Sequence, residues 1–348
     1  MRPAPGRFYN SPLLPSPTLH PLPNLLESTP GAVPLMAPDM AQVDALIRAR
    51  LTSDVALVNQ ISSYIIGAGG KRIRPQLVLL FSSALGFVGP ERLELAAIVE
   101  FIHTATLLHD DVIDQSALRR GRATANSNWG NAPTVLVGDF LYSRAFQLMA
   151  SLDRMDIIRA LADATNVIAA GEVQQLAQIG NSALTEAQYM DVIRGKTAVL
   201  FEAAAHTAAL LADCTPDRVA AMRSYGLNLG MAYQLIDDVL DYDGNAAAMG
   251  KNVGDDLAEG KMTLPLIRTM THGQPCDAQL IKDAIAAHSL DRLDEVVCAV
   301  RRSGALEYTR ALAVSHAEAA IAALAIMPAQ PARDSLVEIA RFSFERTN

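Results

Sequence analysis

Aromatic residues and cysteines are scarce in this sequence of 348 residues. Only 5% of the residues are aromatic, whereas 50% are hydrophobic and alanine is common, so closely packed helices are favoured over a β-sheet. The three cysteines, Cys214, Cys276 and Cys298, show no CxxC spacing and give no sign of a disulfide framework or a zinc site. We therefore expect an all-α protein in a reducing, cytoplasmic compartment.

Positive charge and long apolar runs are also lacking. The formal net charge is −8, which argues against a nucleic-acid partner because binding to a phosphate backbone needs a dominant basic surface. The apolar stretch at residues 197–214 is interrupted by Glu202 and His206, so we expect no membrane-spanning segment. The N-terminus lacks the apolar core of a secretory signal, although Arg2 and Arg7 leave a transit peptide open.

Prolines crowd the beginning of the chain. Ten of the eighteen prolines lie between Pro3 and Pro38, and proline removes a backbone donor and clashes with the preceding helical turn. We therefore interpret residues 1–38 as a disordered leader. A docking arm, or a true start at Met36 or Met40, remains an alternative.

Helical patterning dominates the rest of the chain. Apolar residues recur at helical spacing from Asp39, a plausible N-cap, nearly to the end. No alternating strand pattern and no tandem repeat accompany them. The pattern predicts one helical domain over residues 39–348. The expected breaks are rich in Gly, Asn, Asp or Pro and lie at residues 67–74, 86–90, 119–133, 243–260 and 272–275.

A first acidic motif, HDDVID, follows a segment with one apolar helical face. It contains Asp110, Asp111 and Asp114, and carboxylates three and four residues apart share a helical face. Like charges one turn apart repel each other, so bridging divalent cations would stabilise the cluster. Magnesium suits such a site because it takes few carboxylates and completes its octahedron with waters and phosphate oxygens. For a single motif, a solvated acidic helix end is the alternative.

A second motif, YQLIDDVLDYDG, repeats this spacing with Asp237, Asp238 and Asp241. Two matching carboxylate faces predict one shared metal site. The alternating oxygen ligands and final Glu of an EF-hand are absent. A metal phosphohydrolase that uses His109 and Asp110 as ligands is a rival, but it leaves the second motif unexplained.

Basic residues accompany the acidic motifs. In GAGGKRIRP, Lys71, Arg72 and Arg74 follow flexible glycines, where backbone amides and cationic side chains can converge on a diphosphate. In RRGRAT, Arg119 and Arg120 lie just beyond the first acidic motif, and a guanidinium can hold two phosphate oxygens at once. An ordinary solvated turn is the alternative for each motif.

Together these motifs resemble the trans-prenyltransferase family, and specifically its long-chain polyprenyl diphosphate synthase branch. The resemblance covers the chain from about Asp39 to the C-terminus. The motifs that carry it, in family order, are GGKRIRP, EFIHTATLLHDDVID, RRG, WGN, VGDFLYSRAF, GEVQQL, RGKT, YQLIDDVLDY, GKNVGDDLAEGKMTLPLI and GALEY.

The resemblance implies a large antiparallel helical bundle around a deep central cavity, as a homodimer, with up to about three magnesium ions per active site. It implies that the metal ligands are Asp110, Asp111, Asp114, Asp237, Asp238 and Asp241, with Asp111 in a supporting role. The residues implied to bind the allylic diphosphate are Arg119, Lys196, Thr197, Gln234, Lys251 and Lys261. Those implied to bind isopentenyl diphosphate are Lys71, Arg74, His103 and Arg120.

The implied reaction is a chain elongation. Cations stabilise the leaving diphosphate, the allylic C–O bond breaks towards a carbocation, and the isopentenyl double bond attacks. Magnesium, isopentenyl diphosphate and an allylic diphosphate such as farnesyl diphosphate are then the expected ligands, with transient membrane contact at product release. A non-catalytic partner subunit of another prenyl synthase is a further alternative; it would have degenerate acidic motifs, and both are intact here.

Product length should depend on residues one turn before Asp110. By the helical rise these lie about 6 to 8 Å from the aspartates, and here they are the small Ala105 and Thr106. The family resemblance places bulky aromatics there in short-chain members. We therefore predict a long product, octaprenyl diphosphate for a quinone side chain, within a range from hexaprenyl to decaprenyl. Phe146 and Met149 are candidates for the tunnel floor, with ordinary helix packing as the alternative.

Overall fold

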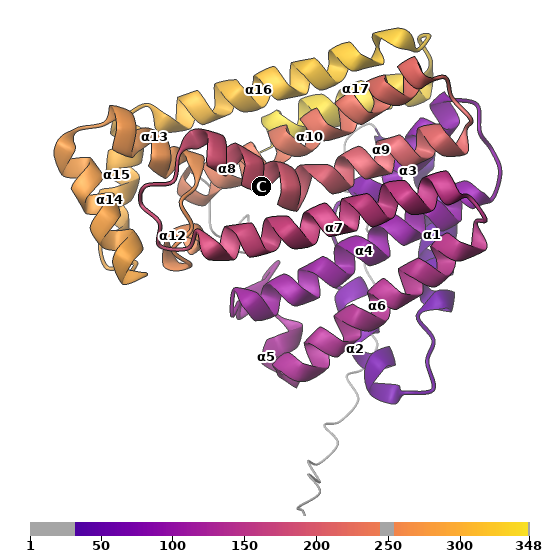
Figure 1. Ribbon diagram of the computed structural model, residues 1–348, viewed down its shortest axis with the longest axis horizontal. Helices are drawn as coiled ribbons and strands as arrows, with labels where there is room; N and C mark the ends of the chain where they lie inside the picture. Colours follow the sequence, from indigo (N-terminus) through magenta and orange to yellow (C-terminus); the bar gives the residue numbers. More distant parts are fainter. Residues whose placement is uncertain (1–31, 244–253, 347–348) are drawn as a thin grey trace, which may run out of the picture.

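The computed structural model describes residues 32–243 and 254–346. Its long helices run side by side in a bundle, which confirms the expected all-α class (Figure 1). The first helices are α1 (Ala32–Arg50), α2 (Ala56–Ile66), α3 (Ile73–Ala84), α4 (Glu91–Ile113), α5 (Ala125–Trp129), α6 (Asn131–Ser151) and α7 (Met155–Ala177). The later helices are α8 (Glu186–Ile193), the π-helix η2 (Arg194–Ala198), α9 (Val199–Leu211), α10 (Pro216–Asp243), α12 (Asp255–Ala258), α13 (Leu264–His272), α14 (Pro275–Ala287), α15 (Leu293–Arg302), α16 (Ala305–Ala323), the 3-10 turn η3 (Leu324–Ile326) and α17 (Pro331–Glu345).

The two helices that end in the acidic motifs, α4 and α10, both pack against α9. The approach of α10 to α9 is close because α10 turns Gly226 and Gly230 towards it. A Cβ atom at Gly226 would lie 2.4 Å from the carbonyl oxygen of Phe201, and one at Gly230 would lie 2.5 Å from the Cα atom of Ala198. These glycines let α9 bring both acidic motifs to the same end of the bundle.

The N-terminal boundary differs from the sequence prediction. Helix α1 begins at Ala32, earlier than the predicted start at Asp39. Met36 and Met40 lie one turn apart on it and are each 4% exposed, because they belong to the hydrophobic core. Helix α1 therefore reaches into the predicted leader. The part of the predicted disordered leader at residues 1–31 lies outside the described residues.

The predicted break at residues 119–133 was also too long. It contains all of a short antiparallel hairpin except Leu118, namely β1 (Leu118–Arg119) and β2 (Arg122–Ala123), and all of α5. The capping Thr124 starts α5 through its side chain, which accepts a hydrogen bond from the Ser127 amide. The hairpin is the one element of sheet among the described residues.

The segment from Ala305 to Ile326, α16 with η3, is long and apolar enough to cross a membrane by length and composition alone. The expectation that the chain has no membrane-spanning segment stays a prediction. In the structure this helix packs against α10, α13 and α17. Core helices of soluble proteins pass the same test, so length and composition do not distinguish a membrane-spanning helix from a core helix.

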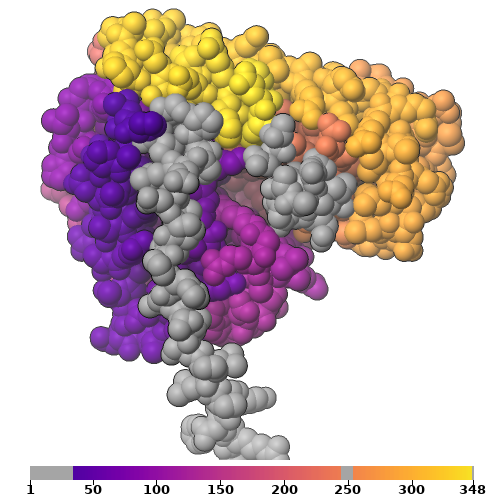
Figure 2. Space-filling view, turned by 180° about the vertical axis from the view of Figure 1, so that it is seen from behind, coloured from indigo at the N-terminus to yellow at the C-terminus, as the bar shows by residue number. Residues whose placement is uncertain are grey.

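The first and last helices of the described chain pack together. Helix α17 packs against α1 and α3, and Figure 2 shows the yellow C-terminal helices adjoining the indigo N-terminal ones. This packing places Arg346, which follows α17, at the pocket between the acidic ends of α4 and α10 that is described below.

Candidate active site

A pocket of about 700 Å³ lies where the acidic ends of α4 and α10 face each other. This volume is typical of a small-molecule site. Its lining comes from the α2–α3 loop, α4, the β-hairpin, α7, α8, η2, α10, α12 and the end of α17. The structure thus brings together segments that are far apart in the sequence.

The first acidic motif turns two of its three aspartates to the pocket. Asp110 and Asp114 are four residues apart on α4 and its C-cap, and both line the pocket. Asp111 is fully buried and accepts a hydrogen bond from Nε of Arg119 at 2.8 Å. Burial raises the pKa of Asp111, and the adjacent Arg119 opposes this shift. Asp111, which is not part of the pocket lining, therefore holds Arg119, which does line the pocket.

The second acidic motif repeats this arrangement. Asp237 and Asp241 line the pocket, and so does Asp238, but Asp238 is only 2% exposed. One oxygen of Asp238 accepts from Nε2 of Gln234 at 2.8 Å, and the other accepts from the hydroxyl of Tyr189. Because successive helical residues are about 100° apart, the second aspartate of each motif turns inward. Asp241 lines the pocket but is also largely buried, at 9% exposure, and accepts a hydrogen bond from the Asp256 amide.

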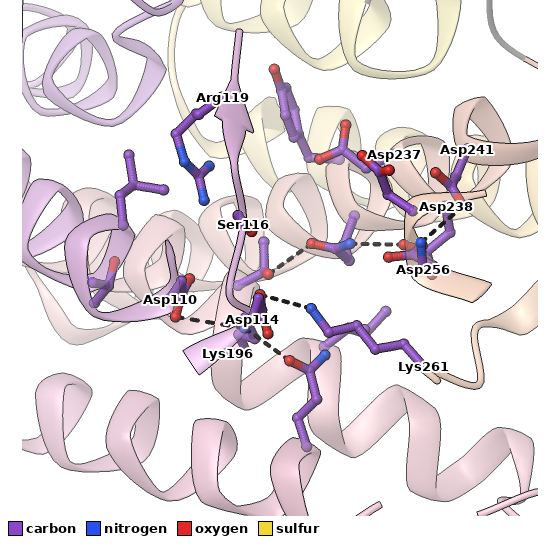
Figure 3. A pocket seen from close by; sticks show the side chains of 18 of the residues that line it. Asp110, Asp114, Ser116, Arg119, Lys196, Asp237, Asp238, Asp241, Asp256 and Lys261 are labelled. Carbon is purple, nitrogen blue, oxygen red and sulfur yellow. Dashed lines mark hydrogen bonds and ion pairs between the residues drawn. The ribbon is translucent and has the colours of Figure 1, made fainter. Parts of the chain in front are cut away.

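Two lysines neutralise the first motif (Figure 3). Nζ of Lys261 donates to Oδ2 of Asp114 at 2.8 Å and lies 2.6 Å from Glu259. Burial alone would lower the pKa of Lys261, but Asp114 and Glu259 outweigh it and raise the pKa. Nζ of Lys196 lies 3.7 Å from Oδ1 of Asp110. The lysines show that these carboxylates attract cationic partners.

The donors fit a hard divalent cation that binds together with a phosphate ligand. Among residues 32–243 and 254–346, no three His, Cys, Asp or Glu side chains converge into a preformed metal site. The pocket instead offers separate oxygen donors from its two acidic walls, Asp110 and Asp114 on one and Asp237 and Asp241 on the other. Magnesium usually takes one or two carboxylates and fills its octahedron with waters and phosphate oxygens, so a complete protein cage is not required.

A basic wall faces the same pocket. Arg74 lies 4.2 Å above the ring of Phe201, and its guanidinium is 3.3 Å from Nε2 of His103. A guanidinium only donates hydrogen bonds, so Nε2 must accept and the proton of a neutral His103 sits on Nδ1. Burial and then the charge of Arg74 lower the pKa of His103 well below its usual range, which keeps the ring neutral.

The α2–α3 loop and the β-hairpin are joined at this wall. Arg120 of the hairpin turn donates to the carbonyl of Gly69, and the hydroxyl of Tyr64 donates to the carbonyl of Ala123 at 2.6 Å. A Cβ atom at Gly70 would lie 2.6 Å from the Arg120 guanidinium. Glycine at this position therefore allows Arg120 to lie against the loop that carries Lys71.

Some residues at the pocket were missed by the sequence prediction. Glu172 binds Nζ of Lys196 at 2.7 Å, and burial together with the charge of Asp110 raises the pKa of Glu172 to about 7. The motif GEVQQL contained this signal but no role was given to its glutamate. Arg346 pairs with Asp237 at 2.6 Å and lies over the ring of Tyr233, and no sequence motif pointed to it.

The residues predicted to control product length are dispersed. Thr106 lines the pocket, whereas Ala105 and Met149 are buried in the hydrophobic core and are not part of the lining. Phe146 is 46% exposed in the single chain, and its place at the tunnel floor stays a prediction. Lys251, predicted to contact the allylic diphosphate, lies outside the described residues.

The rival phosphohydrolase interpretation finds no support in the position of His109. Its Nε2 atom lies 3.2 Å from the carbonyl of Val135 and 3.4 Å from Asp139, both on α6. His109 does not line the pocket. It therefore cannot share a metal there with Asp110 in this arrangement.

Residues 55–300 match the Polyprenyl synthetase family. This chain belongs to that family. It is 50% identical to the octaprenyl diphosphate synthase of Escherichia coli K12, over 90% of this chain and 97% of that protein. It is 44% identical to a geranyl-diphosphate-specific all-trans-nonaprenyl-diphosphate synthase of Rhodobacter capsulatus, over 89% of this chain and 96% of that protein.

A solved member of the polyprenyl synthetase family has the same fold. The polyprenyl synthase of Caulobacter crescentus CB15, crystallised with calcium and isoprenyl diphosphate, superposes with a TM-score of 0.89 at 44% identity, covering 91% of this chain and 97% of that one. Family membership and these relatives make the chain a prenyltransferase and confirm the predicted family, fold and class of reaction.

Proposed function

We propose that this prenyltransferase condenses isopentenyl diphosphate with an allylic diphosphate and makes a long-chain trans-polyprenyl diphosphate, octaprenyl diphosphate for a quinone side chain. The observation that carries the proposal is that one pocket has two acidic walls and a separate basic wall. Such a pocket offers two different subsites for diphosphate groups, one through metal ions and one through direct cationic contacts.

The allylic diphosphate would bind between the acidic walls. Asp110 and Asp114 on one side and Asp237 and Asp241 on the other would hold magnesium, which on binding neutralises the diphosphate and stabilises its departure. In this proposal Asp111 orients Arg119 and Asp238 orients Gln234. The six predicted metal ligands are thereby reduced to Asp110, Asp114, Asp237 and Asp241. The protein groups available for direct contact with this diphosphate are Arg119, Lys196, Thr197, Gln234 and Lys261.

Isopentenyl diphosphate would bind at the basic wall. Lys71, Arg74 and Arg120 supply the cations, and His103 lies against Arg74. Among these, Lys71 has its pKa lowered to about 8, first by burial and then by Arg346. An anionic ligand would restore the charge of this amine, which favours binding of a diphosphate here.

Elongation then follows from charge. The protein's cations favour breakage of the allylic C–O bond, whose electrons leave with the diphosphate. The isopentenyl double bond forms the new C–C bond, and loss of a proton from the adjacent carbon restores a trans double bond. The side chains must also exclude water, because water would capture the cation as an alcohol.

A homodimer is supported by two helices on one side of the bundle. Helices α6 and α7 lie next to each other on the near side in Figure 1. They expose apolar side chains, with Leu136 at 66%, Val173 at 67% and Leu176 at 52% exposure. Exposed apolar residues that recur on adjacent helices favour a protein interface.

We place the enzyme in the cytoplasm, with transient membrane contact for product release.

The test is incubation of the purified chain with magnesium, farnesyl diphosphate and labelled isopentenyl diphosphate, with products separated by length. We expect labelled products around octaprenyl. Asp110→Ala should abolish them, while Asp283→Ala on the exposed face of α14 should not. Absence of incorporation would contradict the proposal, favouring the partner-subunit alternative, whereas phosphate release without isopentenyl diphosphate would favour a phosphohydrolase.

A further inference from the structure

Tyr189 has no assigned role, yet its hydroxyl lies inside the pocket wall. It belongs to α8, is 3% exposed and lines the pocket. Its hydroxyl donates to Oδ2 of Asp238. The hydrogen bond joins α8 to α10 at the second acidic motif.

This bond is one end of a directed chain. Nε2 of Gln234 donates to the other oxygen of Asp238 at 2.8 Å, which turns the Gln234 carbonyl towards Thr197. The hydroxyl of Thr197 donates its proton to that carbonyl at 2.8 Å. Towards the pocket, the Thr197 hydroxyl can then only accept and Gln234 keeps one N–H to donate. Each polar group thus has a defined direction.

The π-helix η2 is what puts both ends of the chain on one face. Tyr189 and Thr197 are eight residues apart, and a regular α-helix would leave them about 80° apart in rotation. Residues 194–198 form a π-helix instead, whose wider turn rotates less per residue. Thr197 therefore returns towards the face of Tyr189, and both side chains reach α10.

We infer that Tyr189 is a positioning residue, which acts through Asp238 to hold Gln234 and Thr197 in the orientation needed at the allylic diphosphate. This inference rests on the proposed function. The hydroxyl is not needed merely to hold α8 in place, because Glu186 on the same helix accepts a hydrogen bond from the hydroxyl of Tyr308 on α16 at 2.8 Å.

That second pair offers a matched control. Tyr189→Phe and Tyr308→Phe each remove one hydroxyl that donates to a carboxylate, but Tyr308 is not part of the pocket lining. With the full chain, magnesium, farnesyl diphosphate and labelled isopentenyl diphosphate, we expect Tyr189→Phe to lower kcat about tenfold. KM for isopentenyl diphosphate should stay within about twofold, since its basic wall is untouched. Tyr308→Phe should leave both constants unchanged.

A double-mutant cycle tests whether the effect travels along the chain. If it does, adding Tyr189→Phe to Thr197→Val lowers kcat little beyond Thr197→Val alone. The Thr197 hydroxyl, which Tyr189 would orient through Asp238 and Gln234, is already missing from the single variant. Independent effects would multiply and would overturn the inference. An equal loss in both Tyr→Phe variants, tracking their melting temperatures, would also overturn it by showing a merely structural role.

Failure of the inference is distinguishable from failure of the proposed function. If the wild type elongates and Tyr189→Phe matches its kcat, only the inference fails. If the wild type makes no product, the proposed function fails, and crystal structures of the wild type and Tyr189→Phe then decide the positioning role. A rotated Gln234 amide in the variant supports it, and an unchanged Asp238–Gln234–Thr197 chain refutes it.

Discussion

The aspartates of each acidic motif divide into two kinds. Asp110 and Asp114 open to the pocket, while the neighbouring Asp111 is fully buried against Arg119. The sequence contains the spacing from which this division follows, since the first and last positions share a helical face. The sequence does not show that Asp111 pairs with Arg119, because Arg119 reaches Asp111 only after the β-hairpin folds back.

Lys71 should make isopentenyl diphosphate binding depend on pH. Burial and the charge of Arg346 lower the pKa of Lys71 to about 8, so the amine loses its charge as the pH rises through this value. The free enzyme then attracts the diphosphate less, and we expect kcat/KM for isopentenyl diphosphate to fall above about pH 8, by at most about tenfold per pH unit.

The control is Lys71→Arg, which stays charged over the whole range. Its kcat/KM should lack the decline that begins near about pH 8 in the wild type. A flat wild-type profile between about pH 7 and pH 9.5, or the same decline in both proteins, would contradict the assignment of this titration to Lys71.

The size of the side chain at position 106 should control how long a product can grow. The Thr106 side chain lines the pocket and donates to the carbonyl of His103 at 2.7 Å. Thr106→Phe places a ring in this space, so we expect the product distribution to shift to shorter chains while incorporation continues. Thr271→Phe on the exposed end of α13 is the control. Unchanged product lengths in Thr106→Phe would exclude a tunnel past this residue.

At the scale of elements, η2 depends on a close approach to α7. A Cβ atom at Gly171 would lie 2.9 Å from the backbone nitrogen of Lys196, and backbone cannot move aside as a side chain can. A Cβ atom at Gly195 would be 3.5 Å from its nearest neighbour, the Cα atom of Gly171, which is ordinary contact. Two facing glycines therefore differ in their tolerance of a methyl group.

We expect Gly171→Ala to destabilise the protein by about 1–3 kcal/mol and to lower kcat by displacing Lys196 and Thr197. Gly195→Ala should leave stability unchanged or raise it by up to about 1 kcal/mol, because alanine is favoured over glycine within a helix where space exists. Urea unfolding and elongation assays on both variants provide the measurement. Equal effects of the two substitutions would show that the close approach does not position η2.

Helix α1 shows how packing overrides a local rule. Pro38 lies inside α1, where proline normally breaks a helix, and this rule placed the predicted start at Asp39. The buried Met36 and Met40 on either side belong to the core. Burial of these two side chains offsets the cost of a proline inside the helix. Local helix preference does not predict this, because the burial depends on tertiary packing.

At the scale of the whole molecule, the exposed apolar residues on α6 and α7 predict the oligomeric state. We expect the wild type to sediment as a dimer and a Leu136→Glu/Val173→Glu variant to shift towards the monomer, because two charges would be buried without partners. Val88→Glu is the control, since Val88 is 81% exposed on the α3–α4 loop. A monomeric wild type, or a variant that remains dimeric, would contradict this interface.

The sequence by itself determined the helical class, the two acidic motifs and the basic residues that accompany them. Helical periodicity and fixed spacing are local properties, so they can be read along the chain. Only the tertiary structure decided which groups meet: Lys261 with Asp114, Tyr189 with Asp238, and Arg346 with Asp237. These contacts join distant segments through the packing of α4, α9, α10 and α17, and no local pattern specifies which side chains that packing brings together.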